Sequence, residues 1–72
     1  MKVLDLLKVV DGNEVISIMD KAGSSWNVLS AGYCEAFVRA GNTEPLMDKE
    51  ILSVYVGVVE PFGLPGLHVI VK

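Results

Sequence analysis

The chain has 72 residues, of which 51% are hydrophobic and 21% are charged, and its net charge is −3 at pH 7. This length predicts one domain, residues 1–72, and the apolar fraction excludes a disordered chain. Domains of this size often rely on disulfides, metals or oligomerisation. Because the chain has one cysteine and one histidine, we expect self-association to be the support that remains.

The charge pattern limits the classes of partner. The six basic residues are scattered and form no run, whereas nucleic-acid phosphates are bound by clustered positive charge, so we expect no nucleic-acid partner. No segment approaches the ~18 uninterrupted apolar residues of a transmembrane helix. Asp5 and Lys8 interrupt the N-terminal apolar segment, which argues against a signal peptide. We therefore expect a cytoplasmic protein without a membrane partner, and a lone cysteine fits a reducing compartment.

The first part of the chain predicts a helix followed by a β-hairpin. Residues 2–10 (KVLDLLKVV) have the apolar spacing of a short helix. Residues 13–20 (NEVISIMD) and residues 26–31 (WNVLSA) alternate as strands do. The polar segment between them, residues 21–25 (KAGSS), predicts a turn in which Gly23 is available for a positive φ.

A second helix is predicted next. Residues 32–42 (GYCEAFVRAGN) have helical spacing, and Gly41–Asn42 is a typical helix end. Tyr33 and Phe37 share one face of this helix, and we expect both in the core. Residues 43–50 (TEPLMDKE) predict a polar connection.

The last part of the chain predicts a second hairpin. Residues 51–59 (ILSVYVGVV) and residues 67–72 (LHVIVK) are apolar on both faces, which is typical of central or doubly covered strands. Residues 60–66 (EPFGLPG) then form a seven-residue loop, longer than most hairpin loops. Phe62 and Leu64 have two alternatives: they pack back on the protein's own core, or they project as preorganised binding contacts.

The order αββαββ predicts the α+β class, with two layers, a four-stranded mainly antiparallel sheet and two short helices on one sheet face. The other face then has no cover within the chain. We expect a homodimer that packs sheet on sheet or joins strand edges. The alternative is a compact monomer with an apolar surface, although large apolar patches are rare on monomers.

The sequence has weak signals for chemistry. Cys34 and His68 could form a nucleophile–base pair, but no third orienting group or oxyanion motif accompanies them. We therefore favour the alternative, in which Cys34 is a small buried apolar residue and His68 is an outward strand residue. Because no metal-loop, nucleotide-binding or metal-ligand spacing is present, we expect no enzyme, no metal and no cofactor.

Large side chains on the predicted strands and last loop are the candidate interface residues: Trp26, Tyr55, Phe62, Leu64 and His68. Tryptophan and tyrosine are favoured anchors at interfaces, although Trp26 could equally pack on the protein's own helix. Two functions remain open. One is a non-enzymatic protein-binding role; the other is binding of a metabolite or signalling nucleotide in a cleft at a subunit interface.

The stretches MKVLDLLKVVDGNEVISIMD and MDKEILSVYVGVVEPFGLPGLHVIVK cover nearly the whole chain. They resemble small, mostly uncharacterised αββαββ proteins encoded by phages and prophages of Gram-positive bacteria. The likeness consists of a short charged helix before a VxIxD strand, and of a closing strand that ends in lysine. The chain departs from them in its proline-rich last loop and its apolar excess. The resemblance implies an accessory protein in the host-cell cytoplasm that binds and modulates a host or defence protein, and it implies no catalytic residues.

Overall fold

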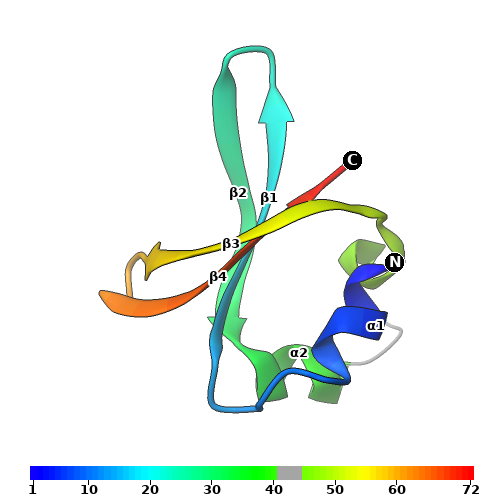
Figure 1. The fold of residues 1–72 in the computed structure, drawn as a ribbon, viewed down its shortest axis with the longest axis vertical. Coiled ribbons are helices and arrows are strands. Elements are labelled where there is room, and N and C mark those ends of the chain that lie inside the picture. Colours follow the sequence, from blue (N-terminus) through cyan, green and yellow to red (C-terminus); the bar gives the residue numbers. More distant parts are fainter. Residues whose placement is uncertain (41–44) are drawn as a thin grey trace.

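The fold is α+β, as the sequence predicts, with four strands and two short α-helices (Figure 1). The computed structural model describes residues 1–40 and 45–72. The elements in chain order are α1 (Val3–Leu7), β1 (Val15–Ala22), β2 (Ser25–Tyr33), α2 (Cys34–Ala40), the short 3₁₀ helix η2 (Pro45–Asp48), β3 (Ile51–Val59) and β4 (Leu64–Val71).

The sheet has the strand order β2-β1-β4-β3. The β1–β2 and β3–β4 pairs are antiparallel hairpins, whereas β1 and β4 pair in parallel, with Val15–Met19 beside Gly66–Ile70. The sheet is therefore mixed: two pairings are antiparallel, and the central one is parallel. Because only five residues of each central strand pair, the two hairpins extend away from this junction in different directions (Figure 1).

The main core lies between the helices and one face of the sheet. Directly paired residues share a face, so Ile16 beside Leu67 and Ile18 beside Val69 point the same way, toward the helices. The buried residues of this core come from α1, α2, η2 and the central strands β1 and β4: Val3, Leu7, Ile16, Ile18, Cys34, Phe37, Met47, Val69 and Val71. Met47 thus anchors the connection before β3.

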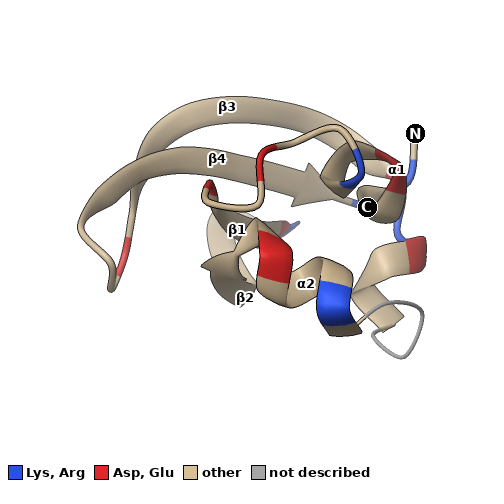
Figure 2. Ribbon diagram, turned by 90° about the horizontal axis from the view of Figure 1, so that it is seen from below, with Lys and Arg blue, Asp and Glu red and all other residues tan. Residues whose placement is uncertain are grey.

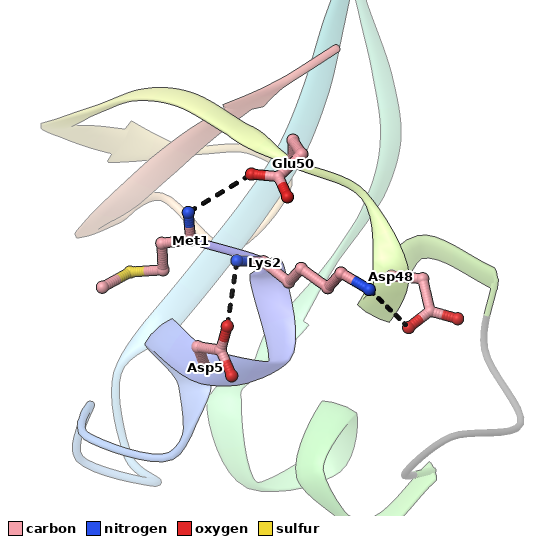
Figure 3. Close-up of polar contacts among 5 residues, drawn as sticks. All are labelled: Met1, Lys2, Asp5, Asp48 and Glu50. Atoms are coloured by element: carbon pink, nitrogen blue, oxygen red, sulfur yellow. Dashed lines mark hydrogen bonds and ion pairs between the residues drawn. The ribbon is translucent and has the colours of Figure 1, made fainter.

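The helix α1 is shorter than the predicted residues 2–10. It begins where the Lys2 backbone N–H donates a hydrogen bond to the Asp5 carboxylate, 3.1 Å away (Figure 3). Beyond its end at Leu7, Val9 is 78% exposed. β-branched valines lose side-chain freedom in a helix, so Val9 and Val10 do not prolong it.

The helix α2 follows β2 without a loop. Tyr33 is the last residue of β2 and is exposed, so its predicted place in the helix and the core is wrong. Phe37 is buried in the core, as predicted. The chain turns at Cys34, whose N–H donates to the Glu14 carbonyl at 2.8 Å and ties the helix start to the β1 approach. The predicted stop at Gly41–Asn42 lies outside the described residues.

The last hairpin differs from its prediction in two ways. The loop has only the four residues 60–63, because β4 already begins at Leu64 and includes Pro65 and Gly66. In addition, β4 is central and its last residues are buried, as predicted, but β3 is an edge strand with exposed apolar side chains. The prediction that β3 is central or doubly covered is therefore wrong.

The face away from the helices is only partly open. Val15, Met19 and Ile70 lie on it and are buried, although the described helices pack on the other face. The loop residue Phe62 packs back on this hairpin junction, with its ring in edge-to-face contact with Tyr33 at 5.5 Å. Of the two alternatives for Phe62, the structure has packing onto the protein's own fold.

Among residues 1–40 and 45–72, no helix combines the length and the apolar character that crossing a membrane requires.

Candidate protein-interaction surface

Strand β3 carries a row of apolar side chains that solvent reaches. Val56 is 75% exposed, and no charged residue occurs from Ile51 to Val59. The exposed members of the row alternate along the strand: Leu52, Val54, Val56 and Val58. Such a continuous apolar stretch on one strand typically marks an interaction site.

The row continues the core face of the sheet. Val54 pairs with Val69 and Val56 pairs with Leu67, and both partners belong to the helix-covered side or pack against it. The β3–β4 hairpin reaches past the helices, which lie beneath the other end of the sheet (Figure 2). The valines of β3 are therefore exposed because the helical layer stops short of them.

Among the described residues, contacts to the outer edge of β3 are found only at its beginning. The Ile51 N–H donates to the Met1 carbonyl at 2.9 Å, and the Val3 N–H donates to the Lys49 carbonyl at 3.1 Å. On the other side, the Glu50 carbonyl accepts from Lys72 at 3.1 Å. The Glu50 carbonyl and the Ile51 N–H belong to one peptide and point in opposite directions, so Met1 lies on the outer side of β3.

An ion pair holds this N-terminal segment in place, because the Met1 ammonium lies 3.2 Å from Glu50 Oε2 (Figure 3). Lys2 forms an isolated antiparallel bridge with Glu50. Within the described part of the chain, the outer edge from Ser53 to Val59 pairs with no other strand. We call this segment, together with Leu52, Val54, Val56 and Val58, the β3 surface.

On the opposite face, His68 is fixed by its neighbours. Its ring stacks on Tyr55 with 4.8 Å between the centroids, and its Nε2 lies 3.0 Å from the Val58 carbonyl. Because a carbonyl only accepts, Nε2 carries the proton and donates. Nδ1 is buried without a hydrogen-bond partner among the described residues. The pair therefore stiffens the hairpin behind the β3 surface.

The predicted interface residues divide into separate groups. Tyr55 and His68 stack on each other. Phe62 is half-buried, and its ring contacts Tyr33. Leu64 is exposed at the start of β4. Trp26 lies on β2, which is an edge strand, in the other hairpin, where the Lys21 ammonium is 5.5 Å from its ring centroid.

The row Val54, Val56 and Val58 was missed by the sequence reasoning, which assigned these valines to a covered strand. The signal that could have found it is the absence of charge over residues 51–59. A long uncharged apolar strand at a sheet edge is a template for pairing, but the edge position itself appears only in the structure.

Cys34 and His68 do not meet. Cys34 is buried in the helix-side core, and its thiol donates to the Leu7 carbonyl at 3.4 Å. Burial raises the pKa of this thiol, and the nearby carboxylates of Asp11 and Glu14 raise it further. His68 lies on the other face of the sheet, beside Ser17 in the register. The sheet thus separates the two members of the nucleophile–base pair considered above.

Two hollows in the described part of the surface lie away from the predicted ligand contacts. The larger, about 410 Å³, lies between α1 and α2 and includes Lys8, Glu35 and Arg39 in its lining. The smaller, about 210 Å³, lies between β2 and α2. Neither includes Trp26 or Tyr55. Among the residues described, no group of three or more His, Cys, Asp or Glu side chains is placed to hold a metal ion.

No protein-family model, curated protein or solved structure matches this chain.

Proposed function

We propose that this protein is a non-enzymatic binding protein that engages a protein partner through the β3 surface. The observation that carries the proposal is the exposed row of aliphatic side chains on an uncharged edge strand. Burying one valine stabilises a complex by roughly 1.5–3 kcal/mol. Val54 and Val56 pair with residues of the helix-side face of β4, so a partner that covers this face contacts both valines at once.

The chemistry of the strand ends restricts the partner. Glu50 and Glu60 flank the apolar segment, so a partner surface with apolar residues at its centre and basic residues around them is favoured. The resemblance to phage and prophage proteins supports a role as an accessory protein that modulates a host or defence protein. We also propose a cytoplasmic location, which the single, unpaired cysteine supports.

A matched pair of variants tests the proposal. Val56 and Val9 are 75% and 78% exposed, but only Val56 belongs to the β3 surface. Val56→Lys places an ammonium in the apolar row, and Val9→Lys makes the same chemical change elsewhere. Proteins captured from a Gram-positive host lysate are quantified by mass spectrometry for the wild type and both variants, after circular dichroism has shown that all three fold.

The expected result is one protein retained by the wild type and by Val9→Lys, and lost from Val56→Lys. Equal recovery of that protein by Val56→Lys contradicts the proposal, because its binding site then lies elsewhere.

A further inference from the structure

We propose that the outer edge of β3 pairs with the same strand of a second copy, antiparallel and about a twofold axis at Val56. This would join two four-stranded sheets into one of eight strands. This inference rests on the proposed function, because both use the β3 surface. It further specifies that a second copy of the chain pairs with the edge, and in which register.

The regularity and the charge of β3 favour a copy of itself. The irregularity in the β3–β4 register lies between Ile51 and Ser53, so Ser53–Val59 is a regular ladder with a regular outer edge. The other edge strand, β2, has its register shift near its middle, opposite Ile18 and Met19, and such bulges protect an edge from pairing. Since Ser53–Val59 has no charged residue, two copies meet there without like-charge repulsion.

The available length of the edge selects the register. When an antiparallel twofold pair shares sheet faces, the residue at the axis lies opposite itself. An axis at Tyr55 would set Ile51 against the partner's Val59, but the Ile51 N–H is already bonded to Met1. It would also set Glu50 against the partner's Glu60, and like charges directly opposite each other are destabilising.

An axis at Val54 is also unfavourable, because it would set Ile51, whose N–H is already bonded to Met1, against the partner's Gly57. An axis at Val56, the middle residue of the open segment Ser53–Val59, avoids all three conflicts. Val56 then lies opposite the partner's Val56, and Val54 lies opposite the partner's Val58. Tyr55 lies opposite the partner's Gly57, so that each aromatic ring has a small neighbour across the interface.

The size of this contact predicts a weak dimer. Seven residues at ~3.4 Å each give a paired edge of about 24 Å. A strip of that length and one strand's width is smaller than the roughly 800 Å² per partner of a standard interface. We expect dissociation in the micromolar range. Pairing also sets the two valine rows side by side on the helix side of the joined sheet, where they form one apolar patch for another protein.

Sedimentation velocity over a concentration series tests the association, and single cysteines test the register. Residues directly opposite each other have Cα atoms about 4.5–5.5 Å apart, within the roughly 4.4–6.8 Å range of disulfides. Val56→Cys is therefore expected to form a disulfide-linked dimer on mild oxidation. In a Val54→Cys or Val58→Cys single variant, the new cysteine lies about four residues, or ~13 Å along the strand, from the same cysteine of the second copy. We therefore expect the double variant to form the disulfide and neither single variant to do so.

The native thiol does not compete, because Cys34 is buried, and Val9→Cys controls for random collision. A sedimentation coefficient that rises with concentration, with Val56→Cys linking fastest, supports the inference. A monomer at every concentration overturns it, as does Val54→Cys linking as fast as Val56→Cys.

The test also separates this inference from the proposed function. A monomer that loses its captured protein on Val56→Lys substitution refutes the second copy and keeps the proposed function. A dimer linked through Val56→Cys, with capture unchanged by Val56→Lys, supports the second copy and refutes the proposed function.

Discussion

Replacing Gly66 by alanine tests the junction on which the whole sheet depends. Gly66 lies on β4 between Val15 of β1 and Gly57 of β3. A methyl group on Gly66 would overlap the Val15 carbonyl oxygen and would lie 3.1 Å from the Val15 Cβ. Because the obstacle is backbone rather than a flexible side chain, β1 and β4 must separate to admit the methyl group.

The structure allows the cost to be bounded. Overpacking a well-packed site costs about 1–3 kcal/mol, while replacing a strand glycine by alanine returns roughly 0.5–1 kcal/mol of chain entropy. Val15 is buried and pairs with strands on both sides, so little relaxation is available to it. We expect Gly66→Ala to lower the free energy of unfolding by about 2 kcal/mol.

Urea unfolding followed by circular dichroism measures this change, and Gly57→Ala is the matched control. A methyl group on Gly57 would meet the His68 ring, whose nearest atom is 3.1 Å away, so the group that must shift is a side chain and not backbone. For a domain of this size, 1 kcal/mol corresponds to a shift of roughly 4–8 °C in melting temperature. If Gly66→Ala is as stable as the wild type, or if Gly57→Ala costs more, the close approach of β1 and β4 is refuted.

Three further predictions concern single side chains. Phe62→Ala removes the ring contact with Tyr33 and is expected to cost about 1–2 kcal/mol by urea unfolding, with Phe62→Leu intermediate; no loss would mean that the loop does not pack back. Gly63 has a φ of 66°, so Gly63→Ala is expected to cost roughly 1–2 kcal/mol in the same assay, and an unchanged midpoint would contradict this loop conformation. For Cys34, the raised pKa of the folded thiol means that above about pH 8.5 the unfolded chain loses a proton that the folded chain keeps. Stability should therefore fall as pH rises, by at most ~1.4 kcal/mol per pH unit; Cys34→Ala should lack this contribution, and identical pH slopes would contradict it.

The local elements could be predicted from the sequence, because each is specified by neighbouring residues. The alternation in β1 and β2 and the turn at Gly23, whose φ is 65°, identify the first hairpin. Residues 60–66 show the limit of this reasoning. Their composition indicates a loop, yet Pro65 and Gly66 belong to β4. Glycine is needed there for the approach of β1, and Pro65 precedes the segment that pairs with β1, where a missing N–H is tolerated.

The candidate surface could not be located from the sequence, because strand order depends on contacts between distant segments. Residues 51–59 and 67–72 have similar apolar patterns, yet β4 is central and β3 is at the edge. The pairing of Met1 with Ile51, which closes part of that edge, joins the first residue to one that lies far along the chain. Neither the strand order nor the Met1–Ile51 pairing can be predicted from a local sequence pattern. The sequence therefore predicts a covered strand for the valines of residues 51–59.

Hydrogen–deuterium exchange at several protein concentrations tests the central claim, that the outer edge of β3 is a binding edge. Edge amides that face solvent exchange quickly, whereas paired amides are protected. We predict that protection of those amides of residues 53–59 that point away from β4 rises with concentration, while that of residues 25–29 on the other edge strand stays constant. Exchange of those outward-pointing amides of residues 53–59 that is fast and independent of concentration would contradict the account.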